Sequence, residues 1–365
     1  MIFEKITRSE TTLLKGLAIS MIVMHNFMHL YSPLPGENEF NFDQEKFYNL
    51  IFQLSNDPID FFRLTLTYFG HFGVQIFIFL SAYGLTLKPT EPNSHLRFII
   101  DRMLKIYPAF IIAIILWSLK ENLQFRPIGF EHGFFGFIDV IFINSEQLLY
   151  KLLLISPFIP GEAYSLVGPW WFIGFIFQFY LAFPLLRKFE YTFGGPGVVI
   201  LSTLSIILTY LVTDLFPIYF TLLGHIPELL FGIYVARKGS LYIPNKAILF
   251  IVFLFIIGNM VPMLWHFNHI SALILLLLVF QKTKDRLQNT KHLNSVISWL
   301  GLISLQLFLI NGFLREPFLT LARNYDHWLA TIIGCLFSFV TASIISYLAL
   351  KAESLIRISI SKHLS

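Results

Sequence analysis

The sequence predicts an all-α, polytopic membrane protein with about ten transmembrane helices. First, 56% of the 365 residues are hydrophobic and 13% are charged, which is too apolar for a soluble domain of this size. Second, the mean hydropathy of +0.68 comes from apolar runs, each about 19 residues long, that recur along the whole chain. Third, 26 Lys and Arg with 22 Asp and Glu are too few to cover a soluble protein with so large a core.

The expected spans follow one another with short connections. Each is long enough, or nearly so, to cross about 30 Å of hydrocarbon. They lie near residues 12–31, 66–87, 103–119, 170–187, 197–216, 218–236, 246–264, 268–281, 296–314 and 328–350. Residues 129–158 are also apolar, but Asp139, Glu146 and Lys151 interrupt them. We therefore expect an interfacial or re-entrant extracytoplasmic segment within 121–169, with an eleventh span as the alternative.

The distribution of positive charge predicts the orientation of the spans. The first span follows a basic start but is too long for a signal peptide and lacks a small-residue cleavage site, so we expect it to be retained. With the N-terminus inside, most Lys and Arg of the connections fall on the cytoplasmic side. They include Lys5, Arg8, Lys88, Arg187, Lys188, Arg237 and Lys238. The positive-inside rule then predicts that the N-terminus and the C-terminus are both cytoplasmic.

We expect residues 1–365 to form a single membrane-embedded domain, because no fixed-period repeat or low-complexity tract divides the chain. The extracytoplasmic loop 32–60 is acidic, with Glu37 and Glu39 among its residues. It is too hydrophilic to be a span and too short to be a separate domain. Basic residues lie between apolar runs rather than in a patch with interleaved aromatics, which argues against a nucleic-acid partner.

His25 is the most informative residue of the first span. An ionisable side chain inside a membrane helix is by default a functional site, although a hydrogen bond to a neighbouring helix would also explain it. A low-dielectric surrounding favours the neutral imidazole, the state that a general base needs. Lys15 lies ten residues earlier, hence about 15 Å away along a helix, and suits the anionic end of an elongated ligand or a snorkelling flank position.

Metal binding at this helix has weak support in the sequence. His29 follows His25 at i, i+4 spacing and lies close to the outer membrane face. No adjoining Glu completes a His-Glu-x-x-His pattern, and Cys335 is the only cysteine, so we predict no metal site. His266 and His269 fall in a short outer turn, where we expect solvated side chains.

Other polar residues in apolar spans have both a functional and a packing interpretation. Glu228 lies three positions after His225 and needs a partner or water, as a proton relay or as a helix-packing hydrogen bond. Arg102 and Lys105 open the third span, where two cations one turn apart hold phosphates or mark the cytoplasmic side. Trp171 suits an interfacial aromatic belt.

Several sequence elements occur in register with a known family. They are Gly73-Val74-Gln75-Ile76-Phe77-Ile78-Phe79-Leu80-Ser81-Ala82-Tyr83, Arg102-Met103-Leu104-Lys105-Ile106-Tyr107-Pro108, Trp171-Phe172 through Gln178-Phe179-Tyr180-Leu181-Ala182-Phe183-Pro184-Leu185-Leu186, and Leu300-Gly301-Leu302-Ile303-Ser304 to Phe308-Leu309-Ile310-Asn311. With Lys15 and His25 they resemble the acyltransferase-3 family of bacterial membrane acyltransferases, whose hallmark is a basic residue and a histidine about ten positions apart.

The chain departs from this family at three places. Lys15 and Lys105 stand where arginine is usual, which removes bidentate phosphate binding and keeps the charge. Asn311 stands where many members have histidine, and it can form hydrogen bonds but cannot act as a base. The acidic residue that often precedes the Gln-Phe-Tyr element is replaced by Ile176 and Phe177.

The resemblance implies transfer of an acyl group, in most members acetyl, from a cytoplasmic acyl-CoA to a hydroxyl of a cell-envelope carbohydrate or glycolipid. It places the protein in the bacterial inner membrane and implies no metal cofactor; a homo-oligomer is compatible with it. Lys15, Arg102 and Lys105 would bind the donor phosphates. His25 would remove the hydroxyl proton or carry the acyl group, oriented by Asn26. The substrate cavity would include His29, His71, Gln75, Ser81, Tyr83, Trp171, Gln178, Glu228 and Asn311.

Two other classes of function remain open at this point. A membrane transporter or lipid-linked glycan flippase would use His25 and Glu228 in a proton or substrate path. A relative without catalytic activity would act as a receptor or scaffold. A transporter should show paired charges or helix breaks in its two halves, and the sequence shows no such symmetry. Binding of coenzyme A would separate the enzyme from both.

Overall fold

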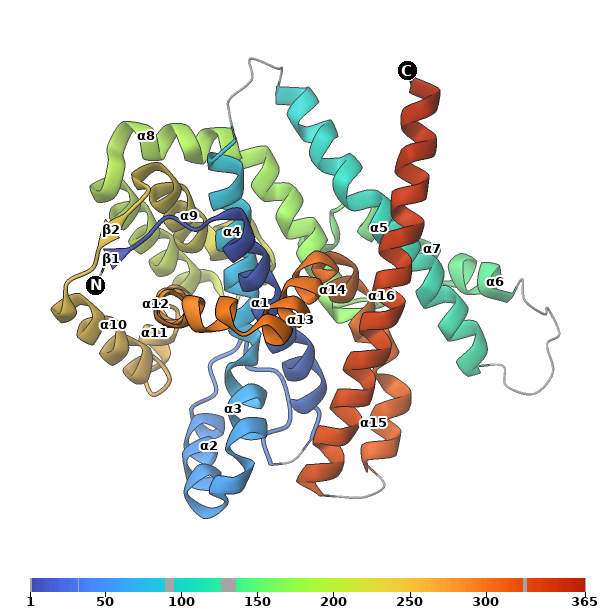
Figure 1. Ribbon diagram of the computed structural model, residues 1–365, viewed down its shortest axis with the longest axis horizontal. Coiled ribbons are helices and arrows are strands. Elements are labelled where there is room, and N and C mark those ends of the chain that lie inside the picture. Colours follow the sequence, from blue (N-terminus) through green and yellow to red (C-terminus); the bar gives the residue numbers. More distant parts are fainter. Residues whose placement is uncertain (1, 32, 89–94, 126–135, 324–326, 365) are drawn as a thin grey trace. The chain divides into compact units, whose positions relative to one another are not determined.

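The computed structural model of the protein is almost entirely helical (Figure 1). It describes residues 2–31, 33–88, 95–125, 136–323 and 327–364, with side chains up to residue 356 in the last helix. Residues 126–135 of the expected extracytoplasmic segment 121–169 therefore lie outside the described residues. The chain divides into two compact units, residues 1–91 with 181–302 and residues 92–180 with 303–365.

The first unit contains the N-terminal helices and the middle of the chain. Its helices are α1 (Arg8–Met28), α2 (Gln44–Asn56), α3 (Phe61–Phe69), α4 (Gly73–Thr86), the part of α8 (Trp171–Val212) from residue 181 onward, α9 (Ile226–Lys238), α10 (Asn245–Gly258), α11 (Pro262–Trp265), α12 (Asn268–Asn289) and α13 (Lys291–Leu302). Short 3₁₀ turns are η1 (Pro58–Asp60), η2 (Gly70–Phe72), η6 (Ile218–Phe220) and η7 (Leu222–His225). Strands β1 (Ile2–Phe3) and β2 (Leu241–Tyr242) pair antiparallel, with Ile2 opposite Tyr242.

α1 is the central helix of this unit and packs against α4 and α13. It begins at a capping box, in which Glu10 N donates to Thr7 Oγ1 at 3.3 Å and Thr7 N donates to Glu10 Oε2 at 2.7 Å. Its close approach to α13 requires glycine, because a Cβ on Gly16 would overlap the carbonyl oxygen of Ile297. The start and the lateral position of α1 are thus fixed by local sequence and by small residues.

The second unit holds the remaining helices. These are α5 (His95–Phe125), α6 (Gly136–Ile143), α7 (Ser145–Leu152), η4 (Ser156–Phe158), η5 (Gly168–Trp170), the first part of α8, α14 (Ser304–Leu314), α15 (Glu316–Arg323) and α16 (Trp328–Leu364). α14 packs against α5 and α16. The buried indole of Trp170 donates to the carbonyl oxygen of Leu309 at 2.9 Å and anchors η5 to α14.

Part of the expected membrane topology is present as long apolar helices. Within the described residues, four helical segments are long and apolar enough to cross a membrane. They are Arg8–Met28, Pro58–Thr86, Gly168–Val212 and Trp328–Ile356. α13 and α14 pass the same test only when taken together, as one span broken at Ile303. The structure therefore supports a multi-pass membrane protein. It has fewer uninterrupted membrane-length helices among the described residues than the ten spans that the sequence predicts.

The differences arise where backbone breaks interrupt apolar sequence. The gap expected between the spans 170–187 and 197–216 is present as a kink at Gly194 (φ 56°), where α8 is two helices joined end to end. The expected span 218–236 begins with the short turns η6 and η7 before α9. Hydropathy alone does not reveal such breaks, because the interrupting residues are themselves apolar or small.

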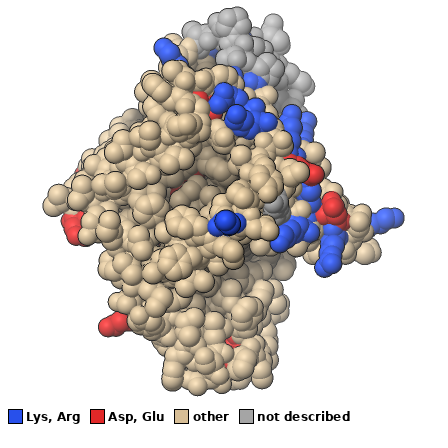
Figure 2. Space-filling view, turned by 90° about the vertical axis from the view of Figure 1, so that its left-hand side faces the viewer, with Lys and Arg blue, Asp and Glu red and all other residues tan. Residues whose placement is uncertain are grey.

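The outer surface carries wide apolar areas. Figure 2 shows one face that is largely without charge, with Lys and Arg gathered toward its upper part and one edge. On α10, Leu249, Phe250 and Phe253 are 68%, 62% and 59% exposed. Exposed apolar side chains at this density suit contact with lipid rather than with water.

Candidate functional site

Close packing of α1 against η2 and α4 brings two histidines of the first unit together. A Cβ on Gly70 would lie 2.6 Å from Cβ of His25, and one on Gly73 would lie 2.5 Å from the carbonyl oxygen of Ala18. Only glycine permits this approach without a shift of the backbone. As a result, the rings of His25 and His71 lie 5.2 Å apart, edge to face.

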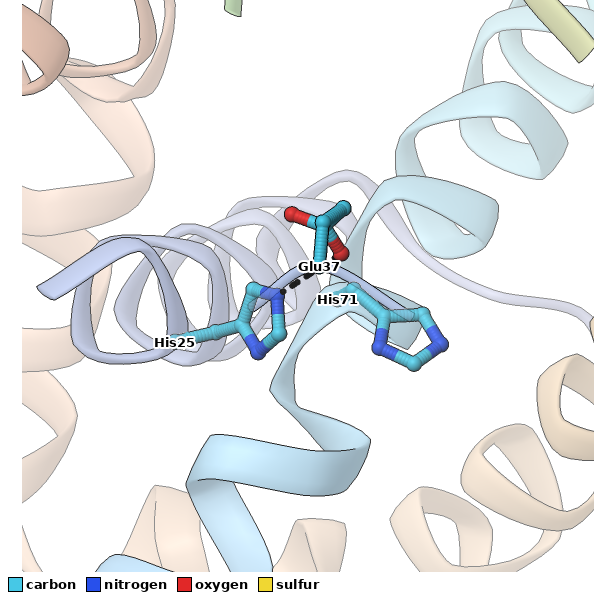
Figure 3. A group of neighbouring side chains, drawn as sticks. All are labelled: His25, Glu37 and His71. Carbon is cyan, nitrogen blue, oxygen red and sulfur yellow. Dashed lines mark hydrogen bonds and ion pairs between the residues drawn. The ribbon is translucent and has the colours of Figure 1, made fainter. Parts of the chain in front are cut away.

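His25 lies in the last turn of α1, is 1% exposed, and has a contact at each ring nitrogen. Nδ1 lies 3.3 Å from the carbonyl oxygen of Leu66, and Nε2 lies 3.4 Å from Oε1 of Glu37 (Figure 3). A carbonyl oxygen only accepts, so the contact to Leu66 assigns a proton to Nδ1. Nε2 faces a carboxylate oxygen, which also only accepts, so both ring nitrogens act as donors in this arrangement, and Nε2 must lose its proton and its contact with Glu37 before it can take a proton from a substrate.

Glu37 reaches the histidines from the segment that follows α1, and its side chain is 32% exposed. Its Oε1 also accepts hydrogen bonds from the backbone N–H groups of Asn38 and Glu39, both at 2.9 Å. Burial raises the pKa of the Glu37 carboxyl, but the charge of His25 and its hydrogen bond, aided by His29 and His71, outweigh burial. The pKa therefore lies well below its usual value, and the carboxylate is ionised.

Glu37 and His25 form a carboxylate–imidazole pair. A carboxylate beside an imidazole fixes the orientation of the ring and stabilises the imidazolium that forms when the ring takes a proton. His25 and Glu37 have the distance and the burial for this work. The sequence leaves catalysis and helix packing as alternatives for His25, and this geometry suits proton transfer.

His29 and His71 complete the cluster. The ring of His29 stacks on that of His25 at 4.8 Å, and its Nε2 lies 3.9 Å from Oε2 of Glu37. His71 is 3% exposed, and its Nδ1 has no hydrogen-bond partner within the described part of the chain. Gln75, one turn further along, is fully buried, and neither of its amide atoms has a hydrogen-bond partner among the described residues. These unsatisfied polar atoms suit a polar ligand or water.

Two residues that were expected in the cavity use their hydroxyl groups in hydrogen bonds to the backbone. The hydroxyl of Ser81 donates to the carbonyl oxygen of Phe77 at 2.8 Å, one turn back in α4. The hydroxyl of Tyr83 accepts from Ile6 N at 2.9 Å and donates to Ile6 O at 3.2 Å. Tyr83 therefore fixes the segment that precedes α1.

Glu228, another residue expected in the cavity, lies in a separate buried group with His225 and His269.

The cationic and aromatic candidates are divided between the two units. Lys15 is half-buried on α1, and its ammonium group is close enough to Lys88 for the charges to repel. In the second unit, the guanidinium of Arg102 lies over the ring of Phe98 at 5.7 Å, and Lys105 is exposed. Both belong to α5, one turn apart.

The other candidates of the second unit lie on α8 and α14. Trp171 is buried and contacts the ring of Phe175, and Gln178 follows on the same helix, half-buried. The Asn311 amide donates to the carbonyl oxygens of Leu307 and Phe308, each at 2.8 Å. Asn311 thus satisfies its amide nitrogen within its own helix.

The structure adds residues that the sequence does not single out for the site. Glu37 belongs to the acidic loop 32–60, and Leu66 contributes only a carbonyl oxygen. Asn26 is half-buried next to His25, while the contacts described above that orient the imidazole come from Leu66 and Glu37. The acidity of the loop 32–60 is the only sequence feature that points to Glu37. No local pattern indicates which of its carboxylates reaches α1.

The expectation that His266 and His269 are solvated is wrong. They are 8% and 3% exposed, because the turn that carries them packs under Tyr219 and Trp265. Nδ1 of His266 lies 2.5 Å from the Tyr219 hydroxyl. Burial lowers the pKa of His266 to about 4, although the charge of Asp214 acts in the opposite direction. His266 is therefore neutral at neutral pH.

Comparison with known proteins gives one family. A family model described as an acyltransferase domain matches residues 10–350 of the chain. Neither the curated proteins nor the solved structures give a match.

Proposed function

Because the chain belongs to the acyltransferase-3 family, and is thus a membrane acyltransferase, we propose that it acylates a hydroxyl of a cell-envelope carbohydrate or glycolipid. The donor is a cytoplasmic acyl-CoA, and acetyl is the first acyl group to test. The observation that carries the proposal is the pair of buried His25 and half-buried Glu37, with Nε2 and Oε1 3.4 Å apart.

The proposed chemistry is direct transfer with His25 as general base. In the step, the acceptor hydroxyl replaces the contact of Nε2 with Glu37, and Nε2 of His25, without its own proton, takes the hydroxyl proton while the oxygen attacks the thioester carbonyl carbon. The new ester C–O bond forms, the C–S bond breaks, and the proton passes from His25 to the departing coenzyme A thiolate. Glu37 stabilises the imidazolium between these two events, and Leu66 O holds Nδ1–H. Asn26 keeps its proposed role as a further orienting group.

The donor phosphates need cations at the cytoplasmic side. Lys15 with the neighbouring Lys88 is the candidate for this role in the first unit, and Arg102 and Lys105 of α5 are the candidates in the second unit. Cations bind phosphate as point charges or by charge-assisted hydrogen bonds. An elongated donor suits the separation of about 15 Å along α1 between Lys15 and His25. In the first unit, His71 and Gln75 are proposed to line the path to the reacting atoms, and Trp171 and Gln178 stay the cavity candidates of the second unit.

The proposal includes the membrane arrangement. The protein would reside in the bacterial inner membrane with both termini in the cytoplasm and about ten crossings, some made by broken helices. The basic residues between apolar segments are then on the side of the donor. The segment that carries Glu37 is on the opposite side, where an envelope acceptor is found.

The experiment is a transfer assay with the full-length protein in detergent or nanodiscs. Radiolabelled acetyl-CoA and cell-envelope glycans are supplied, and the product is identified as an alkali-labile ester. We expect label in the glycan with wild type and none with His25→Ala. His292→Ala, which changes an exposed histidine on α13, is the matched control. Binding of labelled coenzyme A without transfer, or glycan movement without acylation, would contradict the proposal and favour a scaffold or a flippase.

A further inference from the structure

A second group of ionisable side chains lies in the first unit and has no part in the proposed acyl transfer. His225 caps the start of α9, Glu228 lies in its first turn, and His269 lies in the first turn of α12. They are 0%, 1% and 3% exposed. One ligand atom from each lies within 4.8 Å of those of the other two.

Hydrogen bonds fix the tautomers of both imidazoles. Nε2 of His225 lies 2.9 Å from the carbonyl oxygen of Tyr219, and Nε2 of His269 lies 3.1 Å from that of Glu39. Because a carbonyl oxygen only accepts, each Nε2 carries the proton. In a neutral imidazole each Nδ1 is then an acceptor.

Three acceptors therefore converge in a buried space. Nδ1 of His225 is 4.0 Å from Oε2 of Glu228. Within the described residues, neither this oxygen nor Nδ1 of His269 has a hydrogen-bond partner. Buried acceptors without donors carry a desolvation cost, and a bound cation removes that cost for Glu228 and His269 at once.

We propose that His225, Glu228 and His269 bind a divalent transition-metal ion, for which Zn²⁺ is the best match. Two imidazole nitrogens and one carboxylate oxygen are a known zinc ligand set, and they leave one tetrahedral position for water. Ligand atoms in such a complex lie about 3.4 Å apart, so the group contracts by about 1 Å when the ion enters. The two backbone carbonyl oxygens are the outer partners that metal-binding histidines usually have.

The neighbouring cluster of His25, Glu37 and His71 has a similar composition but is a poorer metal site. Oε1 of Glu37 already accepts from Asn38 N and Glu39 N, and its side chain is 32% exposed. A metal would compete there with water and with the contact to His25. The buried group on α9 and α12 has no such competition for Oε2 of Glu228.

The metal site would also stabilise the segment that carries Glu37. His269 holds the carbonyl oxygen of Glu39, which lies two residues after Glu37. Fixing the ring of His269 by coordination therefore fixes one side of the turn that presents Glu37 to His25. We infer a structural ion that keeps this loop in place and takes no part in acyl transfer.

Cobalt binding to the full-length, chelator-treated protein tests the inference. We expect one Co²⁺ per chain with the visible d–d bands of a four-coordinate ion, and displacement of Co²⁺ by Zn²⁺. His269→Asn and Glu228→Gln should each weaken Co²⁺ binding by at least about 100-fold. His71→Asn and Glu37→Gln, which alter the other cluster, are the matched controls and should bind Co²⁺ as wild type does.

X-ray absorption of the wild-type protein loaded with Zn²⁺ does not depend on any variant folding. Two imidazole nitrogens and one carboxylate oxygen in the first shell would support this ligand set, and Co²⁺ binding to the His269 and Glu228 variants assigns it to α9 and α12 rather than to the other cluster. If the protein binds no stoichiometric Zn²⁺, the site is overturned. Glu228 would then be protonated and would donate a hydrogen bond within the group. Loss of binding only in the His71 and Glu37 variants would also overturn it, because the ion would then lie at the other cluster.

Discussion

Nε2 of His25 lies 3.4 Å from Oε1 of Glu37, across a turn that joins the end of α1 to the loop before α2. The carboxylate is ionised because the surrounding histidines lower its pKa against the effect of burial. A pair of this kind keeps an imidazole oriented and stabilises its protonated form. The predictions below follow from this relationship and from the packing that supports it.

Replacement of Glu37 by glutamine should lower kcat by about 10- to 100-fold, because a hydrogen bond to a charged group is worth about 1.5–3 kcal/mol. Glutamine keeps the size of the side chain and removes its charge. Initial rates of acyl transfer with purified protein give the measurement. Glu45→Gln, at an exposed position of α2 in the same loop, is the matched control. Equal rates for wild type and Glu37→Gln would remove Glu37 from the site.

Lys15 should contribute to binding of the acyl-CoA donor and not to the acyl-transfer step. Lys15→Ala is expected to raise KM for acyl-CoA with little change in kcat, because a phosphate contact binds substrate and transition state alike. Lys15→Arg restores the charge and the residue usual in the family, so it should lower KM again. Lys5→Ala, at an exposed position before α1, should leave both constants unchanged. A fall in kcat with constant KM would contradict the donor-binding role.

Gly73→Ala should destabilise the protein and displace His25. The new Cβ would lie 2.5 Å from the carbonyl oxygen of Ala18 and 2.9 Å from a side-chain carbon of Ile22, and such overpacking costs about 1–3 kcal/mol. Gly84→Ala in the same helix meets nothing within 4 Å and should be neutral or stabilising. Thermal unfolding of the two variants makes the comparison. A melting temperature for Gly73→Ala at or above that of Gly84→Ala would show that α1 and α4 are not closely packed there.

Glu39 should make the protein less stable at alkaline pH. Burial and the neighbouring charge of Glu37 raise its pKa well above the usual value of 4.5. A carboxyl whose pKa is higher in the folded protein contributes stability that is complete below pH of about 4.5 and is lost as the pH rises through the folded pKa. Glu39→Gln keeps the neutral shape at every pH. Its melting temperature should fall less than that of wild type between pH of about 5 and about 9; parallel curves would contradict the assignment.

The sequence singles out His25 as a candidate catalytic residue because a lone ionisable group stands out in an apolar helix. It also predicted that the chain is an α-helical membrane acyltransferase, and the family match confirms this. Glu37 could not be predicted in the same way, since its position depends on a loop that folds back on α1 and is held there through Asn38, Lys46 and His269. Selection of one carboxylate among several in an acidic loop requires the tertiary structure.

The turns before α9 and the buried histidines were missed for related reasons. The turns η6 and η7 interrupt the expected span 218–236, where apolar residues continue through the break. His266 and His269 are polar residues in a short turn, and their burial depends on Tyr219 and Trp265 packing over them. Tyr83 belongs to a family element and was assigned to the cavity, yet its hydroxyl is bonded to the backbone of Ile6.

The central claim is that His25 is the general base of acyl transfer. The most direct measurement is kcat for His25→Ala with acetyl-CoA and an envelope glycan, made together with calorimetric binding of coenzyme A to the same preparation. Since general-base catalysis contributes about 10²- to 10⁴-fold, kcat should fall by at least about 100-fold while the dissociation constant of coenzyme A stays unchanged. An unchanged kcat in a variant that binds coenzyme A normally would contradict the account.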